Sequence, residues 1–406
     1  SKCYAAGMES FADVVAQLES GLLQRTAQDL TQRSYFARDD RPANMGVLDF
    51  TQDAASLSRL MRGLDFGGYW NPLTTPKLMA GDQALVIGGL SGTDQTADCG
   101  VVLTVSADRI TIGTASAAVE LSGITTIDGA AVDLSRLFSA GDKIVPPALA
   151  PLPVKDEAFW RAALAGSDWM SCPLAGPASA EDGADLQSRS LAAPKGQDRT
   201  QQAAALALTA LNSSGQGTGT LALCQDTAHP LLVDHVPLTL IATTVTTVAD
   251  VMAQFEKDLE RASNSAGFAT DLALRDPAID HSERTEVGLS FTADAVPGAA
   301  LTLAVTDEGC SIIYDPARIG EAALALLVAR FEAALSQIGT AQTCADLWAL
   351  PKSERDQLLL GWNATGRSYD RTTIHAAFEA QVARTPDAEA LVFEGEVLSY
   401  GDLNNR

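Results

Sequence analysis

Histidine is scarce in this sequence, and its distribution limits the chemistry that the chain can perform. There are four histidines, none precedes His229, and no two of them are adjacent. Histidine is the usual proton-transfer residue at neutral pH. The part of the chain before His229 therefore has no site that depends on a histidine base.

Basic residues are also few: 28 Lys and Arg stand against 51 Asp and Glu, for a formal net charge of −23. So acidic a surface repels nucleic-acid phosphates and anionic lipid, and we expect neither as a partner. The sequence also lacks the apolar run of roughly 20 residues that spans a bilayer, and it does not open on a signal segment. These absences predict a cytoplasmic protein.

Cysteines are few and far apart, so no close-spaced pair indicates a zinc or redox site. The sequence thus predicts no cysteine that binds a metal or a cofactor or that acts in catalysis. We expect reduced, mostly buried thiols, as in cytosolic proteins. The six are Cys3, Cys99, Cys172, Cys224, Cys310 and Cys344.

What the chain does contain is enough apolar sequence, 46% of its 406 residues, for two or three globular domains. Proline recurs from Pro146 to Pro153, and we place a semi-rigid linker at 150–156. It separates a first region, 1–149, from a second, 157–340. A connecting segment and a final region follow, at 341–371 and 372–406.

The first region changes from helical to β-type patterning. Phe11, Val15, Leu18 and Leu22 recur at helical spacing, and a second helix is predicted over 54–64. Short β-type runs then alternate with Gly, Asp and Ser, which is typical of a small closed barrel over about 81–149. These runs are 84–87, 100–105, 109–113, 118–121 and 125–127.

The second region mixes strands and helices, so the overall prediction is a multi-domain α+β protein. The polar stretch 175–196 is predicted to be a locally disordered loop. The final region is expected to hold a helix at 374–383 and a strand at 390–393. Expected strands of the second region are 221–224, 238–241, 286–291, 301–306 and 310–314, and expected helices are 157–164, 201–211, 248–262 and 319–338.

Several short stretches of the first region resemble the rear part of methionyl-tRNA formyltransferase and its relatives. They include Lys2-Cys3-Tyr4-Ala5-Ala6-Gly7-Met8-Glu9-Ser10-Phe11, the run Arg59-Leu60-Met61-Arg62-Gly63-Leu64-Asp65-Phe66-Gly67-Gly68-Tyr69, Asn71-Pro72 and Pro76-Lys77-Leu78. The resemblance implies that the barrel is an OB-like domain. It also implies that the Asn-His-Asp set and the tetrahydrofolate pocket lie in an upstream Rossmann-like subdomain, which these residues lack.

The barrel is poorly equipped for a nucleic acid. An OB-type groove needs cations and stacking aromatic rings on one face. Between Gly81 and Asp142 the basic residues are Arg109 and Arg136, and the only aromatic residue is Phe138. We therefore favour a structural or docking barrel.

The second region resembles the C-terminal half of a condensation domain of nonribosomal peptide synthetases, a chloramphenicol acetyltransferase-like α/β sandwich. The stretches that carry this are Phe159-Trp160-Arg161, His235-Val236-Pro237-Leu238 and Ile312-Ile313-Tyr314-Asp315. The rest of the chain resembles a condensation–adenylation linker, 341–371, and the start of an adenylation domain, 372–406. Its stretches are Trp362-Asn363-Ala364-Thr365, Arg384-Thr385-Pro386-Asp387-Ala388 and Leu398-Ser399-Tyr400-Gly401-Asp402.

The catalytic His-His-x-x-x-Asp-Gly run of condensation domains does not occur here. His229 and His235 lie near Asp234, but their spacing fits no local ligand pattern, so we interpret them as ordinary loop and strand residues. Tyr69, Trp70 and Trp160 are interpreted as packing residues.

The sequence thus predicts a non-catalytic linker segment of a nonribosomal peptide synthetase, an enzyme class of secondary metabolite biosynthesis. It would place a formyltransferase-like catalytic subdomain next to an adenylation–carrier module. The resemblance implies ATP with Mg²⁺, phosphopantetheine and formyl-tetrahydrofolate as cofactors of the parent enzyme, and none for this segment. Its partners would be neighbouring domains of the same synthetase. The alternative is a docking module that binds a carrier protein or another partner.

Overall fold

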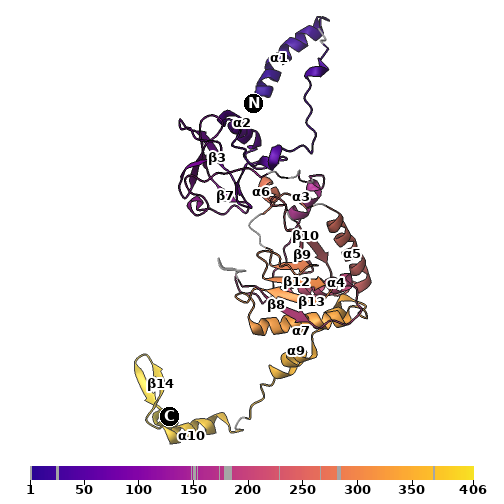
Figure 1. Ribbon diagram of the computed structural model, residues 1–406. Helices are drawn as coiled ribbons and strands as arrows, with labels where there is room; N and C mark the ends of the chain where they lie inside the picture. The colour runs from indigo at the N-terminus through magenta and orange to yellow at the C-terminus, as the bar shows by residue number, and fades with distance from the viewer. Residues whose placement is uncertain are drawn as a thin grey trace. The chain divides into compact units, whose positions relative to one another are not determined.

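The chain divides into two compact units, Ser1–Trp348 and Ala349–Arg406. The structure is a computed structural model (Figure 1). It describes residues 2–23, 27–147, 149, 152, 154–172, 174–177, 185–227, 229–265, 267–280, 285–368 and 371–406, without the side chains of residues 2 and 3. The predicted linker at 150–156 falls partly outside the described residues, as does part of the predicted loop at 175–196.

The N-terminal region begins with helical segments. They are α1 (Lys2–Glu19), the 3-10 helices η1 (Leu30–Gln32) and η2 (Ala43–Gly46), and α2 (Ala54–Leu64). The Asp53 side chain caps α2 by accepting a hydrogen bond from the backbone N–H of Ser56, which fixes the predicted start of this helix. The first helix begins earlier than the pattern from Phe11 predicted.

Seven short strands follow, and they form two sheets. The order of the first sheet is β1 (Lys77–Ala80), β2 (Gln83–Val86) and β7 (Thr125–Thr126). The order of the second is β3 (Gly89–Gly92), β6 (Val119–Ser122), β5 (Arg109–Ile112) and β4 (Val102–Val105), and the 3-10 helix η3 (Leu134–Arg136) comes after β7. Neither sheet closes on itself among the described strands, so the predicted closed barrel is not confirmed.

The remainder of the first unit is a lobe built on a six-stranded mixed sheet. Its strand order is β10 (His235–Ile241), β9 (Thr218–Cys224), β11 (Val287–Ser290), β12 (Leu301–Thr306), β13 (Gly309–Tyr314) and β8 (Gln187–Leu191). The β11 strand runs parallel to β9 and β12, and the other neighbours are antiparallel. The lobe's helices are α3 (Glu157–Ala165), α4 (Arg199–Ser213), α5 (Val248–Asn264), α6 (Leu272–Arg275), α7 (Glu321–Gln337) and α8 (Cys344–Leu347).

The β8 strand corrects the prediction that the whole of 175–196 is a loop. It is polar and mostly exposed, so it lacks the apolar alternation that marks a strand. It is a strand because it pairs antiparallel with β13, in a register that sets Leu191 opposite Cys310. Edge strands commonly carry such polar sequence.

Helix α4 is the centre of the lobe. It contacts β9, β11 and β12 as well as α5 and α7, which lie beside it in Figure 1. Every residue from Gln202 to Leu211 is buried, and five of these are alanines. A helix that is apolar all round belongs in a core, and alanine allows its neighbours to approach closely.

The two parts of the first unit have separate cores that meet. One core lies within 48–138 and the other within 160–347. A third, smaller cluster bridges them, because it joins Met45, Val47, Met79 and Ala84 to Leu152, Leu231 and Ala269. This contact explains why the structure groups both parts into one compact unit.

The second unit is small and open. It holds α9 (Lys352–Asp356), the π-helix η4 (Gln357–Gly361), α10 (Ile374–Arg384), the hairpin β14 (Glu389–Phe393) with β15 (Glu396–Ser399), and α11 (Tyr400–Asn405). The rings of Phe378 and Tyr400 pack with their centroids 5.7 Å apart. The predicted helix 374–383 and strand 390–393 are thus confirmed to within one residue.

The packing of α4 gives a first prediction. Replacing Ala207, which is fully buried, by leucine should overpack the core and lower the free energy of unfolding by about 1–3 kcal/mol. The matched control is Ala325→Leu on an exposed position of α7, which should have little effect. Denaturant unfolding of both variants tests this, and equal stabilities would contradict the buried position of α4.

Candidate functional site: a buried charge cluster that joins the two parts of the first unit

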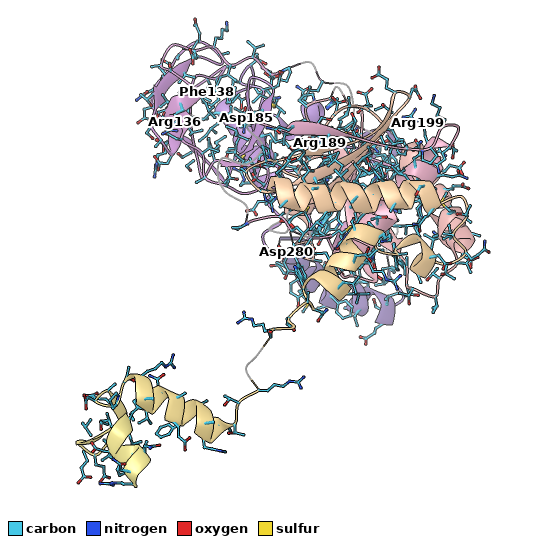
Figure 2. The ribbon with its side chains drawn as sticks, turned by 90° about the horizontal axis from the view of Figure 1, so that it is seen from below. Arg136, Phe138, Asp185, Arg189, Arg199 and Asp280 are labelled. Atoms are coloured by element: carbon cyan, nitrogen blue, oxygen red, sulfur yellow. The ribbon has the colours of Figure 1, made fainter. Side chains whose placement is uncertain are left out.

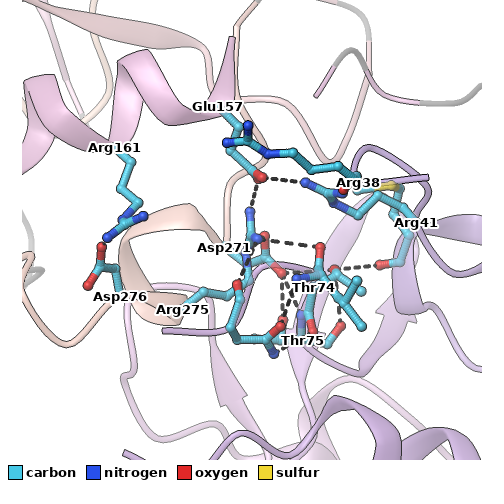
Figure 3. A network of polar contacts seen from close by, with 12 residues as sticks. Arg38, Arg41, Thr74, Thr75, Glu157, Arg161, Asp271, Arg275 and Asp276 are labelled. Atoms are coloured by element: carbon cyan, nitrogen blue, oxygen red, sulfur yellow. Dashed lines mark hydrogen bonds and ion pairs between the residues drawn. The ribbon is translucent and has the colours of Figure 1, made fainter. Parts of the chain in front are cut away.

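Charged side chains are concentrated where the N-terminal region meets the lobe. Arg41 and Lys77 come from the N-terminal region, and Glu157, Asp271 and Arg275 come from the lobe (Figure 3). All five are nearly or fully buried, with side-chain exposures of 8% or less. Charged groups this deeply buried must be paired and hydrogen-bonded.

Asp271 is at the centre of this charge cluster. One carboxylate oxygen lies 2.6 Å from the Lys77 ammonium nitrogen, and the other lies 3.1 Å from Nε of Arg275. Thr75 donates twice to the same carboxylate, from its backbone N–H and from its hydroxyl, both at 2.8 Å. Asp271 thus binds the segment 74–77 to the start of α6.

Burial alone would raise the pKa of Asp271. The charges of Lys77 and Arg275 and the hydrogen bonds from Lys77 and Thr75 outweigh burial and hold the pKa well below its usual value. Burial lowers the pKa of Lys77, against the opposing charge of Asp271. The carboxylate is therefore ionised at neutral pH and has no role as a proton donor.

The Lys77 ammonium also depends on the backbone of η2. It donates to the carbonyl of Met45 at 3.2 Å and to the hydroxyl of Thr74 at 2.7 Å. Met45 has φ of +51°, a left-handed conformation that costs energy in a residue other than glycine. Gly46 follows with φ of +82°, and a Cβ there would lie 2.4 Å from the carbonyl oxygen of Thr75. The local backbone is thus shaped to bring the Met45 carbonyl to Lys77.

Arg275 extends the cluster to Glu157 and Arg41. Its guanidinium forms an ion pair with Glu157, whose second oxygen lies 2.5 Å from Arg41. The guanidinium also donates to the backbone carbonyl of Asn71 at 3.1 Å. In return, the backbone N–H of Asn71 donates to the backbone carbonyl of Arg275 at 3.0 Å. The connection between the parts therefore has backbone as well as side-chain bonds.

Trp70 packs beside this cluster. The guanidinium of Arg161 lies 4.4 Å from its ring centroid, and that of Arg275 lies 5.3 Å away. Arg161 also pairs with the buried Asp276. Trp160 is fully buried in the core of the lobe, so both tryptophans are packing residues as predicted. The prediction for Tyr69 is wrong, because that side chain is 81% exposed.

The other residues that the sequence singled out lie apart from the cluster. His235 opens β10 and pairs with Asp234 at 2.7 Å, while His229 accepts a hydrogen bond from the backbone N–H of Leu231. Within the described residues, no three His, Cys, Asp or Glu side chains gather as metal ligands would. Of the described cysteines, Cys172, Cys310 and Cys344 are buried and all five are free of disulfides, as expected. Burial raises the pKa of Cys172 to about 12.

The sequence also singled out Arg109, Arg136 and Phe138 in the N-terminal region. Phe138 is buried in its core, and Arg109 lies 2.8 Å from Glu120. Arg136 pairs with Asp133 at 3.2 Å, and both Phe138 and Arg136 are labelled in Figure 2. No helix in the described part of the chain is long and apolar enough to cross a membrane.

Comparison with known proteins adds a family relationship. The chain is 37% identical over 127 residues to a linear gramicidin synthase of Brevibacillus parabrevis. It is 32% identical over 126 residues to bacitracin synthase 3 of Bacillus licheniformis. The chain is homologous to nonribosomal peptide synthetases. Each match covers 30% of the chain and 2% of the synthetase, so the chain spans a very small part of these relatives.

A solved structure shares the fold. It is a four-domain nonribosomal peptide synthetase in the holo form, bound to AMP and glycine. The match has a TM-score of 0.50 and 12% identity, and it covers 71% of this chain and 28% of the synthetase. No protein-family model matches the chain.

Sequence reasoning did not foresee the charge cluster, because its members are far apart in the chain. Lys77 and Asp271 are separated by 194 positions, and Glu157 and Arg275 by 118. Two signals point to it in retrospect. Lys77 is the first residue of the otherwise apolar strand β1, and Asp271 and Arg275 have the i, i+4 spacing of a helical ion pair.

Removing the central carboxylate should break this connection. In Asp271→Asn, Lys77 and Arg275 stay buried without their common partner, so we expect a loss of about 3–5 kcal/mol in the free energy of unfolding. The control is Asp356→Asn, since the pair of Asp356 with Lys352 is exposed and should contribute little. A loss no larger in Asp271→Asn than in the control would show that the cluster is not a structural determinant.

The pH dependence of stability should report the same group. The pKa of Asp271 in the folded protein lies below its value of about 3.9 in the unfolded chain. Asp271 therefore stabilises the fold above about pH 3.9, and this stabilisation is lost as the pH falls toward the folded pKa. Denaturant unfolding between pH 7 and pH 3 should therefore give a steeper acid loss for the wild type than for Asp271→Asn. Parallel curves would be inconsistent with an ionised, paired Asp271.

Proposed function

We propose that this chain is a non-catalytic segment of a nonribosomal peptide synthetase that holds a formyltransferase-like catalytic subdomain next to an adenylation–carrier module. In this proposal, the N-terminal region is the C-terminal, OB-like part of a formyltransferase-like domain. The lobe is half of a condensation domain, and Ala349–Arg406 contains a linker and the start of an adenylation domain. The homology to synthetases and the shared fold support it.

The buried charge cluster is the observation that carries the proposal. Five charged side chains and a backbone hydrogen bond from Asn71 to Arg275 join the two parts of the first unit. Separating the two surfaces would take Lys77 from Asp271 and Arg41 from Glu157, so the cluster disfavours sliding or separation. A rigid connection is what a spacer needs, because transfer between active sites depends on their relative position.

The chemistry of the charge cluster supports a structural role as well. Lys77 and Asp271 make their full set of contacts with protein groups, and Asp271 is held ionised. The cluster is therefore a set of mutually paired charges, as a structural contact requires. The parent synthetase would supply ATP with Mg²⁺, phosphopantetheine and formyl-tetrahydrofolate at sites in its other domains.

Helix α1 offers a surface for the catalytic subdomain. Tyr4, Met8, Phe11 and Leu18 recur on one face of the helix and are 59–75% exposed. Apolar side chains gathered on one helix face normally pack against another element. In the proposed arrangement the formyltransferase-like subdomain covers this face.

The experiment measures product formation by the synthetase that contains this chain. Asp271→Asn and, separately, Phe11→Asp should lower formation of the formylated product on the order of 10- to 100-fold, because the subdomain loses its position. Amino-acid-dependent ATP–pyrophosphate exchange should stay near the wild-type rate, because the adenylation chemistry is untouched. Asp356→Asn and Gln17→Asp, on exposed sites, are the matched controls.

Two outcomes would contradict the proposal. Formylation of an aminoacyl thioester by the 406-residue chain alone would show that it is catalytic. Wild-type product formation in both variants would show that it does not position the subdomain. Saturable micromolar binding of a carrier protein to the chain, with product formation intact in the variants, would favour the docking alternative.

A further inference from the structure

We draw no further inference here: the strongest candidate, the exposed aromatic surface that Tyr35 and Phe36 form between η1 and η2, is an unpartnered apolar patch, and nothing in the structure shows what covers it.

Discussion

The ion pair between Lys77 and Asp271 is the constraint on which the arrangement of the first unit depends. Both side chains are fully buried, one on each side of the boundary between the N-terminal region and the lobe. Taking two charges out of water is expensive, and only close approach with further hydrogen bonds offsets it. Thr75 and the Met45 carbonyl provide those bonds, so the pair exists only when the two parts are docked in one position. The cluster thus determines the relative position of the two parts more than it adds to the net free energy of unfolding.

Apolar contacts also stabilise this boundary. The bridging cluster around Met45, Met79, Leu231 and Ala269 buries surface from both parts, which favours association without dictating its geometry. The charge cluster beside it selects one geometry, because a slide of a few ångströms would separate Arg41 from Glu157 and Lys77 from Asp271. Together, the apolar contacts and the charge cluster hold the two parts of the first unit in one relative position. The charge cluster also accounts for the left-handed backbone at Met45, whose carbonyl must face Lys77.

The sequence predicted those elements whose pattern is local. The β12 strand spans the predicted 301–306, and α2 spans the predicted 54–64, because apolar periodicity and a capping aspartate define them. The β8 strand escaped prediction because Gln187 to Ser190 are polar and exposed, and only pairing with β13 makes them a strand. The charge cluster escaped because its residues meet only after folding. The sequence pattern could not decide whether the short strands form a closed barrel, because such strands can form two open sheets as readily as one closed sheet.

Hydrogen exchange tests the central claim most directly. The amide of Asn71 donates to the Arg275 carbonyl and that of Thr75 to the Asp271 carboxylate, so both report on the docking of the two parts. If the cluster locks them together, these amides should exchange as slowly as that of Leu303 in β12, through opening of the whole unit. If instead they exchange as fast as exposed loop amides while Leu303 stays protected, the two parts separate freely and the cluster does not hold them.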